Sequence, residues 1–261
     1  MTKLKDVPCV FVHYPTGAGG WFFSSLLYHC FDDSEPLLFD QVGSGHANRS
    51  ISYTTNFYKD FLQEDQGLDI IYDRNYENFT KSQRVDYIKN KLLVAPDANI
   101  STHVISIHCK NINVFLEALP RLKVVQINIT DRDLLKCTYN YLYKVLSQTP
   151  INFHTFCEER GITGLELATA REKIQNLNRE NMEYFLWVVP FIEETNQTIP
   201  NDPSFASRIY SMMYEDYMTT NPETMMKEIL DFVECDYDQD LLDRACGHVL
   251  SYRMTQPIFP E

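Results

Sequence analysis

The sequence predicts an α/β protein with a central parallel sheet flanked by helices. The clearest indication is the segment "STHVISIHCKNINVFLEALPRLKVVQINITDRDLLKCTYNYLYKVL", which alternates strand, helix, strand and helix. Such alternation is typical of parallel βαβ units. Two further segments join an apolar strand to a helix, one through clustered glycines and one through a proline. Since no repeat or low-complexity linker interrupts the 261 residues, we expect a single domain over 1–261.

The individual elements are predicted from apolar spacing and from turn residues. Apolar residues fill a short buried strand at 9–14, and glycines lead from it into a helix over 21–31. Thr163 and Glu166 have capping-box spacing and open a long amphipathic helix that ends before Pro190. The stretch 34–66 is assigned as irregular. The remaining predicted elements are helix 81–93, strand 102–108, helix 112–119, strand 122–129, helix 131–146, strand 208–214, a helix led by Pro222 and a last helix over 239–254.

Charge and cysteine content narrow the classes of partner and the compartment. The net charge is −13, and the acidic excess is concentrated between residues 191 and 243. An acidic chain argues against nucleic-acid binding, which depends on basic patches. No apolar run approaches the roughly 20 residues of a membrane span, and the first residues lack a secretory signal. Seven scattered cysteines without a CxxC pair indicate reduced thiols, so we expect a cytoplasmic protein without a membrane anchor.

The turn "PTGAGGW" is the first candidate site. Glycine lacks a Cβ atom, so the backbone can approach a phosphate closely, and the first amides of the helix point toward it. The amides of Gly17, Ala18, Gly19 and Gly20, with the Thr16 hydroxyl, could cradle an anion in this way. The turn lacks the lysine of a complete phosphate-binding loop. A tight strand-to-helix turn without any ligand is the alternative interpretation.

Three segments together resemble the sulfotransferase superfamily, whose P-loop-related fold binds 3′-phosphoadenosine 5′-phosphosulfate. "YPTGAGGWFFSSLL" resembles the 5′-phosphosulfate loop, Pro-Lys-Ser-Gly-Thr-Thr-Trp. The segment "SIHCKNINVFLEALPRLKVVQINITDRDLLKCTYNY" is similar to the middle of that family, and "YSMMYEDYMTTNPETMMKEILDFVE" to its Tyr-Glu-Asp-Leu strand and following helix. The resemblance implies a sulfotransferase-like fold with core motifs at 9–31, 102–146 and 208–235, and a helical elaboration at 155–195.

The resemblance also implies roles for particular residues. Residues Thr16 to Gly20 and Trp21 would bind the 5′ end of the donor, and Arg132 and Thr138 would lie near its 3′-phosphate. His108 matches the catalytic histidine, and its ordinary pKa near 6.5 suits removal of a proton from an acceptor hydroxyl. A structural histidine that caps helix 112–119 is the alternative.

The departures from the family pattern concern charge. Thr16, Ser106 and Thr130 stand where the family has two lysines and an arginine. Arg132 could supply a guanidinium from one residue away, and its planar fork suits phosphate. No arginine-lysine-glycine segment is found near the C-terminus, where Arg253 is a spare cation, as are Lys110 and Arg49.

Other polar groups are expected to be structural. Glu215 and Asp216 could form a carboxylate pair, and "ECDYDQD" at 234–240 could suggest calcium. The second segment lacks the spacing of an EF-hand loop, so a solvated face is expected there. No metal is implied. His13, His46 and His103 are also assigned structural roles.

Three functions remain open from the sequence. The first is sulfuryl transfer from 3′-phosphoadenosine 5′-phosphosulfate to a hydroxyl or amine of a small-molecule or glycan acceptor. The second is a catalytically degenerate protein that binds or assembles, as a homo-oligomer or within a larger protein assembly. The third is a P-loop nucleotide kinase, against which the missing lysine counts.

Overall fold

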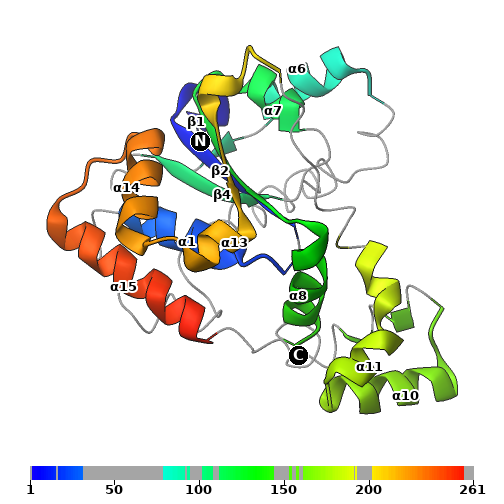
Figure 1. Cartoon of the computed structure of the whole chain (residues 1–261). Helices are drawn as coiled ribbons and strands as arrows, with labels where there is room; N and C mark the ends of the chain where they lie inside the picture. Colours follow the sequence, from blue (N-terminus) through cyan, green and yellow to red (C-terminus); the bar gives the residue numbers. More distant parts are fainter. Residues whose placement is uncertain are drawn as a thin grey trace.

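Four parallel strands form the main sheet of the chain, which is a computed structural model (Figure 1). The structure describes residues 2–15, 17–31, 79–91, 93–94, 102–107, 112–143, 153–154, 157–158, 161–190, 192 and 202–255. Across the sheet the strands are β4 (His103–Ile107), β2 (Cys9–His13), β5 (Leu122–Asn128) and β6 (Ile209–Met213). The α/β class, the parallel sheet and the four predicted strands are therefore confirmed.

Strand β2 lies between the two strands that follow it in the main sheet. Val10 is paired with Val104 of β4 on one side and with Lys123 of β5 on the other, and all three strands run in the same direction. The chain thus moves from β2 to one neighbour and then crosses to the opposite side. In open α/β sheets, ligands bind beyond the carboxyl ends of the strands at such a reversal of strand order. A separate small antiparallel sheet joins β1 (Thr2–Lys3) to β3 (Leu93–Val94).

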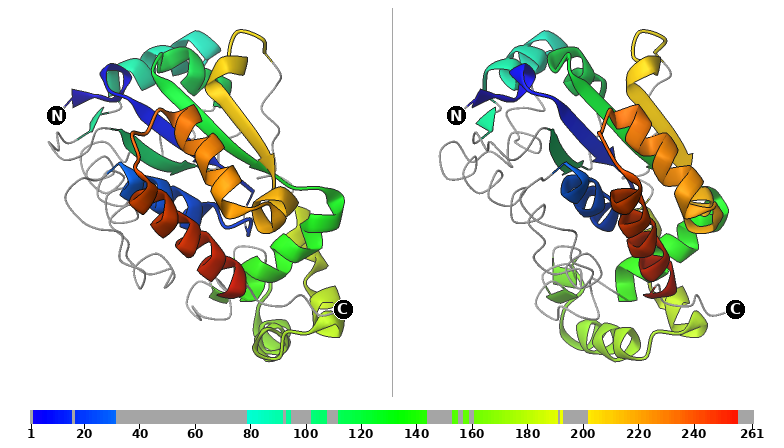
Figure 2. Two further views of the ribbon diagram at one scale, coloured as in Figure 1. Left: turned by 60° about the vertical axis from the view of Figure 1, so that its left-hand side comes forward. Right: turned by 90° about the vertical axis from the view of Figure 1, so that its left-hand side faces the viewer.

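Helices cover both faces of the sheet (Figure 2). Along β2 the buried side chains alternate: Val10 and Val12 belong to one apolar cluster, and Cys9 and Phe11 to another. This period of two is what a strand buried on both faces requires. The first cluster includes α1 (Gly20–Cys30), α14 (Pro222–Val233) and α15 (Gln239–Thr255). The second includes α6 (Lys81–Lys91) and α7 (Ile112–Ala118).

Two helices begin at capping side chains. The Thr130 hydroxyl accepts a hydrogen bond from the Asp133 amide at 3.3 Å and donates to its carboxylate at 2.8 Å, at the start of α8 (Asp131–Tyr141). The Asn221 side chain accepts hydrogen bonds from the Glu223 and Thr224 amides, and the proline at 222 occupies the first turn of α14. Caps of this kind satisfy first-turn amides that have no partner within the helix. The predicted helix starts at 131 and 222 are confirmed.

The prediction of one long helix from Thr163 to Pro190 is wrong. The chain instead forms α10 (Gly164–Gln175), α11 (Arg179–Tyr184) and a short 3₁₀ turn, Leu186–Val188. The Asn178 side chain accepts from the Asn181 amide at 2.8 Å, and the Asn181 side chain donates to the Asn176 carbonyl at 2.8 Å. Asparagine competes with helical hydrogen bonds in this way and starts a new helix. Thr163 precedes α10, but its side chain makes no capping hydrogen bond.

Candidate functional site

The glycine turn lies at the carboxyl end of β2. Gly17 and Gly19 have φ of +86° and +72°, a conformation that residues with side chains rarely adopt. The Ala18 amide donates to the Pro15 carbonyl at 3.1 Å, which closes the turn, and α1 begins at Gly20. The predicted strand, glycine turn and helix are therefore present, at the edge of the sheet where such folds bind ligands.

The first turn of α1 carries backbone donors that the helix itself leaves unpaired. The N-cap residue is Gly19, which has no side chain to cap the helix, and the first helical hydrogen bond runs from the Phe23 amide to the Gly19 carbonyl at 3.1 Å. The amides of Gly20, Trp21 and Phe22 precede that bond, so they have no acceptor within the helix. Together with the helix dipole, they form a region that favours an anion.

The same glycines are required for packing. A Cβ atom at Gly17 would lie 2.1 Å from the Cys137 carbonyl oxygen of α8, and one at Gly20 would lie 1.9 Å from the Tyr14 ring. Both distances are too short for any side chain. The turn is therefore packed tightly between the end of β2 and α8. This packing fixes the orientation of the backbone amides that follow the turn.

A buried hydrogen-bond network also holds the turn in place. The Asn140 side-chain amide of α8 donates to the Tyr214 hydroxyl at 3.1 Å and to the Gly17 carbonyl at 3.5 Å. Tyr214 begins α13 (Tyr214–Thr219), directly after β6. Burial raises the pKa of Tyr214, so this hydroxyl remains neutral. The ends of β2 and β6 are therefore joined through one side chain of α8.

Two of the predicted ligand donors are occupied by the protein itself. The Thr138 side chain is fully buried, and its hydroxyl donates to the Leu134 carbonyl at 2.8 Å. A threonine inside a helix readily donates to the carbonyl four residues earlier. The Ala18 amide is likewise used within the turn. These two groups are already engaged within the protein, and the ligand contacts predicted for them stay predictions.

The other predicted residues are placed only in part. Gly17, Gly19 and Gly20 form the turn, and Trp21 is the second residue of α1. Arg132 is the second residue of α8, and its side chain lies outside the part that the structure describes. Thr16 and His108 also lie outside the described residues, as do Lys110, Arg49 and the stretch 34–66.

Arg253, predicted as a spare cation, has a structural role. Its guanidinium donates to the Tyr217 carbonyl at 3.0 Å and to the Thr220 carbonyl at 2.8 Å. These carbonyls lie at the end of α13, where helices leave acceptors unpaired. Arg253 therefore fastens α15 to α13 beside the glycine turn.

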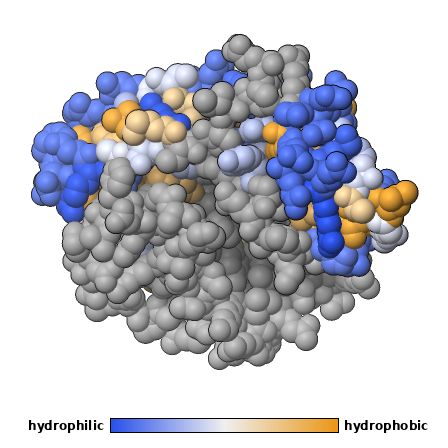
Figure 3. Space-filling view, turned by 90° about the horizontal axis from the view of Figure 1, so that it is seen from below, coloured by the Kyte–Doolittle hydropathy of each residue, from blue (hydrophilic) through white to orange (hydrophobic). Residues whose placement is uncertain are grey.

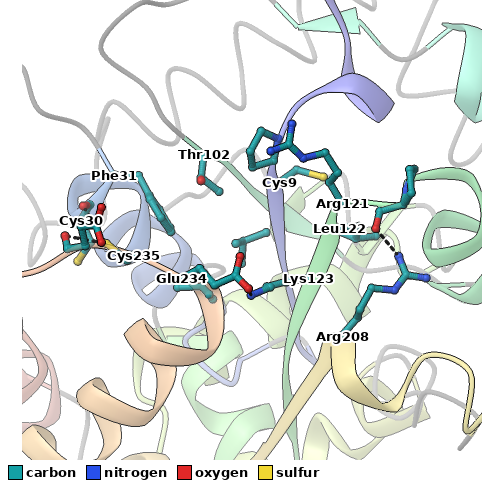
Figure 4. Close-up of a pocket in the computed structure, with 15 residues that line it drawn as sticks. Cys9, Cys30, Phe31, Thr102, Arg121, Leu122, Lys123, Arg208, Glu234 and Cys235 are labelled. Atoms are coloured by element: carbon teal, nitrogen blue, oxygen red, sulfur yellow. Dashed lines mark hydrogen bonds and ion pairs between the residues drawn. The ribbon is translucent and has the colours of Figure 1, made fainter.

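A cavity of about 550 Å³ lies at the opposite, amino-terminal edge of the sheet (Figure 4). Two cations that line it donate to carbonyls at helix ends. Lys123 donates to the Phe232 carbonyl at 2.6 Å and also pairs with Glu234 at 2.8 Å. Arg208 donates to the Leu116 carbonyl at 2.7 Å. Since these bonds cap the C-termini of α14 and α7, the cavity has few free donors for an anion. The sequence held no motif for it, because its lining comes from strand starts and helix ends.

The acidic segments also have structural roles. Glu215 and Asp216 lie in the first turn of α13, where negative charge is favourable. In the segment 234–240, the Asp238 carboxylate accepts from the Leu241 amide at 2.8 Å. In the described part of the chain, no three His, Cys, Asp or Glu residues are placed to hold a metal ion.

Apolar side chains are exposed on several helices. Leu165 and Met254 are 85% and 79% exposed. Figure 3 views the molecule from below, where apolar residues lie among hydrophilic ones. Among the helices that the structure describes, none has both the length and the apolar character needed to cross a bilayer.

Comparison with known proteins adds no further assignment. No protein-family model matches the chain, and no curated protein matches its sequence.

Proposed function

We propose that the chain is a sulfotransferase-like protein, with a P-loop-related fold, that binds 3′-phosphoadenosine 5′-phosphosulfate at the glycine turn. The observation that carries the proposal is the uncapped first turn of α1 at the carboxyl end of β2. The three motif segments support it, because they supply the four neighbouring strands of one parallel sheet. The first-turn amides of Gly20, Trp21 and Phe22 would hold the 5′ end of the donor.

In the proposed reaction, His108 acts as the base. The acceptor oxygen attacks sulfur and forms a new S–O bond, while the bond between sulfur and the bridging phosphate oxygen breaks. His108 takes the proton of the acceptor hydroxyl, and adenosine 3′,5′-bisphosphate leaves with the electron pair of the broken bond. The backbone amides would stabilise the charge on the leaving phosphate. An amine acceptor reacts in the same way through nitrogen.

The second candidate is a protein that binds the nucleotide and does not catalyse transfer. The small number of cationic and hydroxyl donors at the site favours it. Thr16 replaces a lysine, and the Thr138 hydroxyl is fully buried. Loss of one well-placed donor typically lowers the rate by about 10²- to 10³-fold. A chain that kept the amide cradle without these donors would still bind the nucleotide.

Calorimetric titration with adenosine 3′,5′-bisphosphate tests the binding step. We expect the wild type to bind, and Arg132→Ala to weaken binding about tenfold through the loss of a charge-assisted hydrogen bond. Arg171→Ala, a change on the exposed part of α10, serves as the matched control and leaves affinity unchanged. Absence of binding by the wild type at millimolar nucleotide would refute the proposal.

Assays of sulfuryl transfer to hydroxyl and amine acceptors then separate the two candidates. If the protein is an enzyme, His108→Ala abolishes transfer and leaves nucleotide affinity intact. If the wild type binds the nucleotide and transfers nothing to any acceptor, the second candidate holds.

A further inference from the structure

Two arginines that line the cavity at the amino-terminal edge of the sheet carry charges that no carboxylate neutralises. Arg121 directly precedes β5 and Arg208 directly precedes β6, and both line this cavity of about 550 Å³ (Figure 4). Among the described residues, neither guanidinium forms an ion pair. The chain has 36 acidic residues and only 23 lysines and arginines, so two unpaired arginines at one cavity are a local exception.

The two guanidiniums differ in how many of their donors are free. Arg208 donates to three carbonyls in α7 and just after it, at 2.7, 2.9 and 3.3 Å. These partners hold the side chain in place, but they carry no net charge and do not neutralise it. In the described part of the chain, Arg121 makes one hydrogen bond, to the Asp6 carbonyl at 3.4 Å. Most of the five N–H donors of Arg121 are therefore available to a ligand.

Both positive charges act on the same buried thiol. Cys9 lines the cavity and is 1% exposed. Burial raises the pKa of Cys9 to about 12, and the nearby charges of Arg121 and Arg208 oppose that rise. The thiol stays neutral, so it cannot serve as a counter-ion. Since like charges repel more strongly where water is partly excluded, an anion in the cavity would be stabilised by both arginines and would reduce the repulsion between them.

The opposite side of the cavity limits the charge that this anion can carry. Figure 4 shows Cys30 and Cys235 across the cavity from the two arginines. The residues on either side of Cys235, Glu234 and Asp236, also line the cavity, and Glu234 is paired with Lys123 at 2.8 Å. A phosphate group carries nearly two negative charges at neutral pH, so these acids repel it more strongly than a carboxylate, which carries one. The cavity therefore favours a carboxylate.

We propose that this cavity binds a small organic carboxylate at Arg121 and Arg208. Arg121 donates two parallel hydrogen bonds to the carboxylate, a pairing that the planar guanidinium favours, and Arg208 adds a fixed positive charge. The rest of the ligand lies toward Phe31 and Thr102, which Figure 4 shows farther across the cavity. The volume is within the range of about 300 to 1,000 Å³ that is typical of small-molecule sites. The inference is independent of the proposed nucleotide site, which lies at the other edge of the sheet.

Calorimetric titration of the full chain with succinate, a small dicarboxylate, and with its uncharged diamide tests the site. We expect the wild type to bind succinate and not the diamide. Arg121→Met removes the guanidinium at the cost of one long hydrogen bond, so we expect the chain to fold and its affinity for succinate to fall about tenfold. Arg171→Met is the matched control: it changes the net charge equally, lies on the exposed part of α10 and leaves affinity unchanged.

Several outcomes would overturn the inference. The wild type could bind no succinate at millimolar concentration, or bind succinate and its diamide equally well. Arg121→Met could bind succinate as tightly as the wild type, which would place the ligand elsewhere. Inorganic phosphate is the third probe, and tighter binding of phosphate than of succinate would contradict the choice of a carboxylate. Should Arg121→Met not fold, Arg121→Lys decides: it keeps the charge and loses the planar fork, so unchanged affinity would exclude the predicted contact.

Discussion

Replacement of Arg253 by methionine tests whether this cation is structural. The Arg253 guanidinium donates to the Tyr217 and Thr220 carbonyls at 3.0 and 2.8 Å, and Arg253→Met removes these donors while it keeps most of the aliphatic volume. A hydrogen bond to a charged group contributes about 1.5 to 3 kcal/mol, and partial exposure reduces the sum for both carbonyls. We therefore expect the free energy of unfolding to fall by about 2 to 3 kcal/mol, or about 5 to 10 °C in melting temperature.

Arg244→Met on the same helix is the matched control. Arg244 pairs with Asp240 at 3.1 Å across one exposed helical turn, and such pairs contribute only about 0.3 to 0.5 kcal/mol. Urea unfolding of both variants gives the two free energies directly. Equal losses for Arg253→Met and Arg244→Met would refute the structural assignment. So would an Arg253→Met variant that keeps its stability and loses nucleotide affinity, because Arg253 would then act on the ligand.

Three further changes test other contacts. Gly20→Ala would bring a Cβ atom to 1.9 Å from the Tyr14 ring, so we expect it to lower the free energy of unfolding by about 3 kcal/mol. Gly247→Ala, which has open space around it in α15, should instead raise the free energy of unfolding by about 1 kcal/mol, and urea unfolding of both variants checks these opposite signs. Asn178→Ala removes the cap of α11 and costs about 1 kcal/mol in the same assay, and no loss would contradict the capping role. Burial raises the pKa of Cys9 from 9.0 to about 12, so the folded chain retains a proton that the unfolded chain releases above about pH 9, and the stability falls as the pH rises from there. Between pH 7.5 and 10.5 the melting temperature should therefore fall less steeply for Cys9→Ala than for the wild type.

The four strands of the main sheet and several helices were predictable because they carry a local signal. In β5 the residues Leu122, Val124, Val125 and Ile127 are apolar, as expected of a strand buried on both faces, and Pro120 ends the preceding helix. In α14 a proline after Asn221 marks the helix start. Neighbouring residues suffice for these assignments, so these elements follow from a single sequence.

The errors arise where distant or competing contacts decide. The apolar spacing of Leu167, Ala170 and Ile174 correctly predicted the buried face of α10. It did not indicate that Asn178 would cap a second helix. The role of Arg253 depends on hydrogen bonds to carbonyls at the end of α13, about 35 residues earlier in the chain. No local pattern distinguishes an arginine that caps a helix from one that binds phosphate.

The glycines at 17, 19 and 20 are therefore weak evidence for a nucleotide when considered alone. Each one is already required by close packing, against Cys137, Tyr252 or Tyr14. A turn with no ligand would need the same residues. Packing explains why the N-cap of α1 is a glycine, but a glycine offers the first-turn amides no side-chain acceptor at the carboxyl edge of the sheet. An oxyanion at that edge would supply the acceptor that these amides lack, whereas a purely structural turn would not.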